Sequence, residues 1–581
     1  MSKIISIWKR REFDPGIENK LLKICTILEP DNIQANKPVI HVNGKWSYGI
    51  MNPTSSLLKT GSGVLLGRLF GDFKEWDEIG HSGIDGSFAL FRDHSNFCEI
   101  CSDVAGTRSI WYYMNKEYFI TSTSQRAIVM FLGGFEFNQE VVPWMLSTGS
   151  LGPFLSWDKR IKLLPPDSAL LLDKESWTAE LKTEPIVFKS RKITKKEGYD
   201  RVFSAIHHTF DHLRLDFDKW AVTLSGGRDS RGILLTLLAK SEAAKKIKTY
   251  THGHRGNQEI KGTDGYIAKK IADKYGLRND FFSSMTISEE ESLEVVYDRI
   301  LKVGEGRVDH IKAYLDGFSF WKYLFDSKTE GILRGDMSFG FPFNVKLKTE
   351  KEANKFTNFF PCQHYANLAH LENSGMKKHV FPDELRPMES ESMNVFLERI
   401  YSVYRTPIVL AALSDFKLSY VEVLSPLLSR KILNAVRSLP ENLRLGTPIW
   451  KAYINQLENK IPYSHQDAHD PLDQEDLKKA FYDYKLKSIR KSHFLPEYLK
   501  DLIPEIKNPQ QISFNGNNLR LKDKIRKLIS RKQRFFIWKY LGGNHKKEVV
   551  SKGKLMDRLF IISEMQRILH SDANTLNSIK S

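Results

Sequence analysis

The stretch from Ala221 to Leu238 constrains the fold of this chain more than any other. It begins as an apolar run, breaks into Ser-Gly-Gly-Arg-Asp-Ser, and resumes with the apolar spacing of a helix. This pattern predicts a strand, a tight loop and a helix in succession. Gly226 and Gly227 lack a Cβ atom, so the loop backbone can turn sharply and direct its N–H groups at a bound anion. The positive end of the helix dipole strengthens such a site.

The polar side chains of this loop predict that the anion is a magnesium-bound phosphate group. Ser225 and Ser230 offer hydroxyl donors, whereas Asp229 only accepts at neutral pH, which in a phosphate site suits a Mg2+ ligand. The loop is not a Walker A loop, because it lacks the Gly-x-x-x-x-Gly-Lys-Ser/Thr pattern and its lysine. The alternative is a simple helix start, in which Asp229 or Ser230 caps the helix.

The loop resembles the pyrophosphate-binding loop of the ATP pyrophosphatase family. From about residue 60 to about residue 465 the chain is similar to asparagine synthetase-like amide ligases, including β-lactam synthetases and lasso-peptide cyclases. Residues 84–91, 103–112 and 119–124 resemble the glutaminase-type domain of that family, and 163–172 resemble the strand that leads out of it. The loop at 225–230 would belong to its synthetase domain.

The resemblance implies a fold that combines α/β and α+β parts. We expect a glutaminase-like β-sandwich domain of the N-terminal nucleophile (Ntn) type over residues 1–190. A Rossmann-like synthetase domain (adenine nucleotide α-hydrolase fold) with a helical C-terminal part would follow over 195–515. Residues 516–581 would form a basic helical C-terminal extension.

The N-terminal domain is predicted to have lost glutamine hydrolysis. In the family, the second residue is a cysteine whose free α-amino group serves as base. Here Ser2 follows Met1, and the first cysteine is Cys25. A serine exposed by removal of Met1 would still be a nucleophile, which leaves a glutamine-hydrolysing asparagine synthetase as an alternative. However, glutamine-using members carry Gly-Glu-Ile-Tyr-Asn where residues 67–71 read Gly-Arg-Leu-Phe-Gly, so both polar residues are missing.

The resemblance places the adenine of ATP along the backbone near Leu224 and Thr251. The segment 246–253 is predicted to be the next parallel strand. Asp264 matches an aspartate common at the start of the following helix in the family. The alternative is that Asp264 is an ordinary helix N-cap.

A second acidic position follows another predicted strand. Residues 332–340 take the place of the family signature Ser-Gly-Glu-Gly-Ser-Asp-Glu, in which Gly335 and Ser338 match and Asp336 falls on the glutamate. That glutamate is thought to help the incoming amine lose its proton. Phe339 replaces the aspartate that gives the second magnesium contact, so either Asp336 takes the metal role or the metal is held more weakly. The alternative is that Asp336 only closes a turn.

Residues 422–428 and 439–451 follow the helical layout of the family around its acceptor pocket. The lysine that contacts the phosphates has no counterpart in 461–467, and His465 or Lys451 would replace it; Lys451 is alternatively a surface lysine. The predicted site comprises the catalytic residues Asp336 and Lys451, the nucleotide-binding residues Leu224, Ser225, Gly226, Gly227, Asp229, Ser230, Thr251 and Gly335, and the metal ligands Asp229 and Asp336.

Composition agrees with two or three domains that have sizeable cores, since 41% of the 581 residues are hydrophobic. An apolar stretch long enough for a transmembrane helix is not found, and the apolar segment near the start is too short for a signal peptide. Four cysteines in this length indicate a reducing compartment, so the cytoplasm is the expected location.

About two-thirds of the net charge of +17 lies between residues 520 and 558. This stretch has a helical apolar period. It is either an appended basic helix that docks on a membrane surface, a nucleic acid or an acidic partner, or the solvated outer face of an ordinary core helix.

The function these features favour is ATP-dependent amide-bond formation. A small-molecule or peptide carboxylate would attack the α-phosphorus of ATP, and an amine or ammonia would then displace AMP from the acyl-adenylate. Family context suggests a specialised peptide or surface-polysaccharide pathway. Two other classes stay open: an RNA-modifying adenylating enzyme, which the character of the N-terminal domain disfavours, and a non-catalytic nucleotide-binding or interaction homologue.

Overall fold

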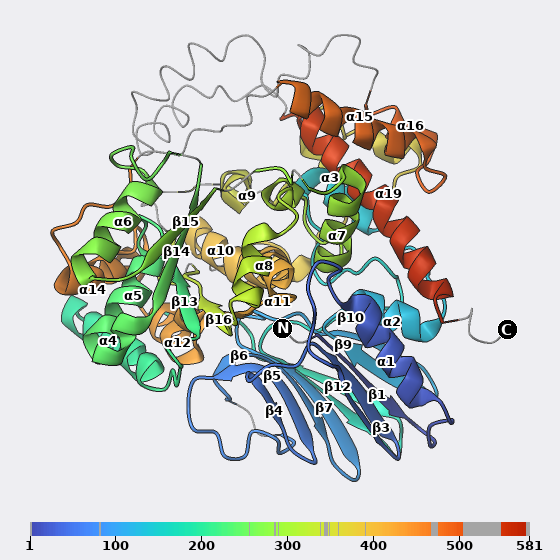
Figure 1. Ribbon diagram of the computed structural model, residues 1–581, viewed down its shortest axis with the longest axis horizontal. Helices are drawn as coiled ribbons and strands as arrows, with labels where there is room; N and C mark the ends of the chain where they lie inside the picture. Colours follow the sequence, from blue (N-terminus) through green and yellow to red (C-terminus); the bar gives the residue numbers. More distant parts are fainter. Residues whose placement is uncertain are drawn as a thin grey trace.

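The structure is a computed structural model that describes residues 3–80, 83–254, 256–283, 286–288, 290–336, 338–341, 347, 349–357, 359–389, 391–465, 475–503 and 548–576. Ser2, Asp467 and residues 520–547, for which the sequence makes predictions, lie outside these ranges. The described chain is a mixed α/β structure built on three sheets (Figure 1). This confirms the mixed class predicted from the sequence.

Two antiparallel sheets make up the N-terminal part of the chain. Their strands are β1 Lys3–Lys9, β2 Val39–Asn43, β3 Trp46–Met51, β4 Leu57–Lys59, β5 Gly63–Leu69, β6 Gly86–Asp93, β7 Phe97–Ser102, β8 Trp111–Met114, β9 Tyr118–Ser122, β10 Lys162–Leu163, β11 Ser168–Asp173 and β12 Thr178–Thr183. One sheet has the order β10-β8-β9-β1-β3-β2 and the other β12-β11-β7-β6-β5-β4. Trp8 of the first sheet and Phe91 of the second belong to one buried cluster, so the sheets pack face to face.

The third sheet is parallel throughout and has five strands. The strands are β13 Trp220–Thr223, β14 Lys248–Gly253, β15 Asn279–Ser283, β16 Gly331–Leu333 and β17 Glu422–Leu424. Their spatial order is β15-β14-β13-β16-β17, so the chain moves outward from β13 in one direction and then returns to continue in the other. In such sheets, ligands bind at the carboxyl ends of the strands where the order reverses, here between β13 and β16.

Helices cover both faces of the parallel sheet (Figure 1). The α-helices are α1 Ile17–Leu28, α2 Gln125–Leu132, α3 Val141–Thr148, α4 Lys195–Asp211, α5 Asp229–Lys240, α6 Asp264–Tyr275, α7 Leu293–Gly304, α8 Ser319–Asp326, α9 Glu350–Thr357, α10 Met393–Ile400, α11 Ala411–Leu418, α12 Arg430–Arg437, α13 Glu441–Arg444, α14 Pro448–Leu457, α15 Glu475–Lys491, α16 Glu497–Lys500 and α19 Lys552–Asn574. The short 3-10 helices are η1 Glu242–Lys246, η2 Ile311–Tyr314, η3 Cys362–His364, η4 Leu371–Ser374, η5 Asp383–Leu385 and η7 Pro426–Leu428. A π-helix, η6 Tyr401–Leu410, joins α10 to α11 and contains Pro407.

Helix α19 is part of the core. It packs against α2, α3, α7 and α15, and Arg126 of α2 donates to both carboxylate oxygens of Asp572. Arg558 is 2% exposed and donates to Asp309 and to the carbonyl of Leu146. Arg558, the last residue of the basic stretch 520–558, is therefore buried and paired with an acid. The docking role predicted for this stretch stays a prediction for residues 520–547. Of the helices within the described ranges, none combines the length and the apolar character that crossing a bilayer requires.

Candidate functional site

The predicted anion loop joins β13 to α5 and is closed by its own serines. The N–H of Ser225 donates to Ser230 Oγ at 3.0 Å, and the N–H of Gly227 donates to Ser225 Oγ at 3.2 Å. Arg228 occupies the N-cap position of α5, and its side chain forms no cap hydrogen bond. The structure therefore does not have the simple helix cap by Asp229 or Ser230 that was the alternative interpretation of this motif.

Segments from elsewhere in the chain hold the loop tightly. A Cβ at Gly226 would lie 2.8 Å from Ser464 Cβ and 3.0 Å from Asp264 Oδ1, which leaves no room for a side chain there. The N–H of Ser464 donates to the Gly226 carbonyl at 3.0 Å. Thr263, not Asp264, caps α6 by accepting from the N–H of Tyr266. The interpretation of Asp264 as the N-cap is thus wrong, and its carboxylate lies beside the loop.

Trp450 of α14 holds the carboxylate of Asp229. Its indole N–H donates to Asp229 Oδ1 at 2.7 Å, and its ring stacks on Phe339 with centroids 4.2 Å apart and an interplanar angle of 11°. Burial raises the pKa of Asp229, the Trp450 hydrogen bond opposes this rise, and the nearby charge of Asp336 adds to it. Phe339, at the position where the resembled signature has an aspartate, therefore packs on the residue that holds the Asp229 carboxylate.

The loop after β16 brings Asp336 to the same place. A Cβ at Gly335 would lie 2.5 Å from Asp229 Cβ and 2.8 Å from the Ser230 nitrogen, so the two loops pack backbone to backbone. Asp336 is 7% exposed. Its Oδ2 accepts from Ser425 Oγ at 2.7 Å, and its Oδ1 lies 3.1 Å from Arg334 Nε. The structure thus brings the two predicted acids together where the strand order reverses.

Several basic side chains lie near Asp336. Arg334 also donates to Ser414 on α11 at 3.1 Å, and Lys417, one turn further along α11, lies with its amine 5.6 Å from the centre of the Trp321 ring. Burial and then the charge of Arg334 hold the pKa of Lys417 well below its usual range, while Asp336 opposes this. Burial also lowers the pKa of His310, and Lys417, Arg405 and Arg334 lower it further. No motif in the sequence predicts this cluster.

The other predicted nucleotide-binding residues lie near the loop. Leu224 donates its N–H to the carbonyl of Tyr250 at 2.8 Å, which ties β13 to β14. The Thr251 hydroxyl donates to Asn279 Oδ1 at 3.1 Å, so its hydroxyl is committed within the sheet. Lys451 follows Trp450 on α14 and is half-buried, and His465 donates its N–H to the Gly262 carbonyl at 3.0 Å. Their roles toward adenine and phosphate stay predictions.

The acids suit a Mg2+ ion that arrives with phosphate groups. Trp450 occupies Asp229 Oδ1, and Oδ2 forms no hydrogen bond with the described residues. Both oxygens of Asp336 are engaged by Arg334 and Ser425. Among the described residues, His, Cys, Asp and Glu side chains nowhere gather in the groups of three that would hold a metal by themselves. Mg2+ typically takes one or two carboxylates and completes its shell with phosphate oxygens and water, which fits Asp229.

Replacing Asp229 with asparagine is expected to raise the free energy of unfolding of the nucleotide-free protein at neutral pH. Because the folded-state pKa of Asp229 is raised, ionisation costs stability that is regained as the pH falls through that pKa. Asparagine can keep the Trp450 hydrogen bond without the charge. Thermal unfolding at several pH values measures the difference, which should shrink in acid. The exposed Asp273→Asn is the matched control, and a lower melting temperature for Asp229→Asn than for wild type at neutral pH would contradict the argument.

Comparisons with known proteins leave the family undecided. No family model matches the chain, and no curated protein does. Among solved structures, an allosteric regulatory enzyme of purine biosynthesis is 10% identical over 55% of this chain and 95% of its own, with a TM-score of 0.21. A glutamine phosphoribosylpyrophosphate amidotransferase from B. subtilis, complexed with ADP and GMP, is 10% identical over 81% of this chain and 99% of its own, with a TM-score of 0.20. TM-scores this low carry no argument about this chain, and the family resemblance stays a prediction.

Proposed function

We propose that this chain is an ATP-dependent amide-bond-forming ligase that adenylates a substrate carboxylate and transfers the acyl group to an amine. The observation that carries the proposal is the contact between the Gly226–Ser230 loop and the Gly335–Asp336 loop. It places two carboxylates, backbone N–H groups and the start of α5 at the reversal point of a parallel sheet. The proposal implies that the parallel sheet and the helices on its two faces are the Rossmann-like synthetase domain.

Each residue has a role that its geometry supports. Ser225, Gly226, Gly227 and Ser230 would bind the leaving pyrophosphate, and Asp229 would hold the Mg2+ ion, which neutralises phosphate charge when bound. The substrate carboxylate oxygen forms a bond to the α-phosphorus as the bond to pyrophosphate breaks. Asp336 would then take the proton that the amine loses as it displaces AMP. Pyrophosphate release supplies the driving force, and the protein supplies position.

The cation cluster supports an anionic substrate at this place. The guanidinium groups of Arg334 and Arg405 lie near Asp336, whereas burial favours the neutral form of the Lys417 amine. A carboxylate that enters here meets favourable charge on one side and the anion loop on the other. The cluster would also offset the missing phosphate-contacting lysine.

We infer that the N-terminal domain is a structural remnant of a glutaminase. Arg68, which stands in place of the glutamate of the Gly-Glu-Ile-Tyr-Asn motif, is turned toward the other half of the chain. It donates to the Arg214 carbonyl at 3.2 Å, lies 3.8 Å from Glu330, and stacks over Trp220 at 5.3 Å. These contacts support an interdomain role for Arg68.

The test is carboxylate-dependent exchange of pyrophosphate into ATP, measured with a panel of aspartate, uronic acids and acidic peptides. Wild type should support exchange with one class of carboxylate, and Asp229→Ala should lower it about tenfold or more. Asp273→Ala, on an exposed face of α6, is the control. Absence of exchange with every carboxylate, together with absence of magnesium-dependent ATP binding, would refute the ligase proposal.

A second candidate function is nucleotide binding without catalysis. The specific observation that favours it is the Trp450 indole, which occupies one oxygen of Asp229 and packs on the Phe339 that replaces a metal ligand. This candidate predicts magnesium-dependent ATP binding that never leads to exchange or to AMP formation.

A further inference from the structure

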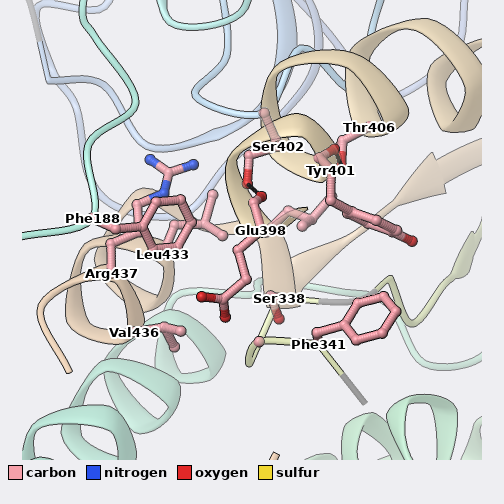
Figure 2. A pocket seen from close by; sticks show the side chains of 13 residues that line it. Phe188, Ser338, Phe341, Glu398, Tyr401, Ser402, Thr406, Leu433, Val436 and Arg437 are labelled. Carbon is pink, nitrogen blue, oxygen red and sulfur yellow. Dashed lines mark hydrogen bonds between the residues drawn. The ribbon is translucent and has the colours of Figure 1, made fainter. Parts of the chain in front are cut away.

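A small pocket opens beside the Asp336 loop, and the proposed chemistry leaves it without a role. Figure 2 shows its walls. They come from α10, η6, α12 and the segment 338–341, and the N-terminal domain and the connecting segment add Ala105 and Phe188. The pocket therefore lies where the two halves of the chain meet.

Three polar atoms of its lining residues form no hydrogen bond with any described residue. These are Glu398 Oε1, Ser338 Oγ and Arg437 Nε. The three residues are only 5%, 7% and 9% exposed. Buried polar atoms are nearly always hydrogen-bonded, so atoms left over at one pocket indicate that a polar ligand completes them. In Figure 2, the Glu398 carboxylate and the Ser338 hydroxyl are directed toward the same space.

The free oxygen of Glu398 determines which chemical group fits. Its other oxygen, Oε2, accepts from Arg444 Nε at 2.9 Å. Burial raises the pKa of Glu398, and the charge of Glu441 adds to the rise. The charge of Arg444, its hydrogen bond and a backbone hydrogen bond from Phe341 oppose it. An ionised carboxylate only accepts, so Oε1 needs a donor N–H or O–H, while the Ser338 hydroxyl can donate or accept. The guanidinium groups of Arg437 and Arg444 lie nearby and disfavour a cation, so a neutral donor fits better than an ammonium ion.

The apolar lining of the pocket and its position beside the acid pair suit the amine substrate of the proposed reaction. Phe341, Leu433 and Val436 supply apolar surface for a carbon stem. Tyr401 lines the pocket and lies within reach of the acid pair. Burial raises the pKa of its hydroxyl, Arg405 opposes this rise, and the charges of Asp336 and Asp229 add to it. A group held by Glu398 is therefore close to the reacting centre without occupying the anion loop.

We propose that this pocket binds the acceptor amine as a neutral primary amine on a short carbon chain, with one N–H donated to Glu398 Oε1. The inference rests on the proposed ligase function. The amine nitrogen forms the C–N bond to the acyl carbon while the bond from that carbon to AMP breaks. AMP leaves with the electron pair, and the surplus amine proton goes to Asp336. Glu398 binds and orients the amine.

Kinetics with a series of amines test this assignment. With a carboxylate that supports exchange, Glu398→Gln should raise the KM for propylamine about tenfold or more, while the KM for the carboxylate changes less than about threefold. Ser338→Ala, a smaller change, should raise the propylamine KM about threefold. The exposed Glu389→Gln is the matched control. Exchange without any change of the propylamine KM in Glu398→Gln and Ser338→Ala would overturn the inference and leave the ligase proposal standing.

Direct binding provides a second readout that requires no carboxylate and no variant. Propylamine and trimethylamine are isomers, but neutral trimethylamine has no N–H to donate. At mildly alkaline pH, with total concentrations chosen so that the two neutral amines are equally concentrated, propylamine should raise the melting temperature of the wild type by about 1 °C more than trimethylamine. Equal shifts for both amines would refute the pocket assignment even if exchange fails or Glu398→Gln does not fold.

Discussion

Replacing Gly335 with alanine is expected to lower carboxylate-dependent exchange and magnesium–ATP affinity about a hundredfold or more, because a displacement near 1 Å at a reacting centre has that effect. An alanine Cβ at 335 would lie 2.5 Å from Asp229 Cβ and 2.8 Å from the carbonyl carbon of Asp229 and the nitrogen of Ser230. Two of these three neighbours are backbone atoms, which cannot rotate aside. The start of α5 must therefore move away from Asp336, and the two carboxylates separate.

Unfolding of the Gly335→Ala protein distinguishes damage to the site from loss of the folded structure. Overpacking of this kind lowers the free energy of unfolding by about 1–3 kcal/mol, so the protein should still be folded when its activity is lost. Gly61→Ala is the control, because a Cβ there meets nothing within 4 Å. A Gly335→Ala protein that exchanges pyrophosphate and binds ATP within threefold of wild type would show that the contact between the two loops has no part in the site.

The anion loop could be predicted from sequence because its signals are local. An apolar run, two glycines and a second apolar stretch lie within twenty residues, and each specifies its own backbone geometry. Helix α5 begins at Asp229, two residues after Gly227, as this local pattern predicts. The pairing of this loop with Asp336 was foreseen only through the family resemblance, since more than a hundred residues separate them.

The residues that support the site could not be found in this way. Trp450 binds Asp229 across 221 positions of sequence. Arg231, which is fully buried, donates to the carbonyls of Ile461 and Pro462 and so fixes the segment over the loop. Lys417 looks like an ordinary lysine on an amphipathic helix. Such contacts depend on how distant helices pack, and neither periodicity nor residue spacing records that packing.

The contacts between the two halves of the chain could not be predicted from the sequence either. Arg108 lies in a stretch whose resemblance to a glutaminase domain suggested only membership in that fold. In the structure it donates to Glu422 at the start of β17, and the two side chains are 3% and 1% exposed. The pair joins the N-terminal domain to the strand that leads to Ser425, the donor to Asp336.

Replacing Arg108 with methionine is therefore expected to lower the free energy of unfolding by about 3–5 kcal/mol, because it leaves the Glu422 carboxylate buried without its cation. The pair is not ideally satisfied, since Arg108 Nε and Glu422 Oε2 form no hydrogen bond with the described residues. Burial also lowers the pKa of Arg108 to about 10, which reflects the cost of enclosing this charge. An apolar pair of similar volume should consequently restore the loss.

The double-mutant cycle of Arg108→Met and Glu422→Leu tests this by urea and thermal unfolding. Each single variant should unfold at a clearly lower denaturant concentration, and the double variant should return to within about 1 kcal/mol of wild type or exceed it. Additive losses in the double variant would mean that the two side chains stabilise the interface separately and that their ion pair is incidental. Pyrophosphate exchange in the restored double variant then decides whether the N-terminal domain acts on the site through packing alone, because packing is what the apolar pair preserves.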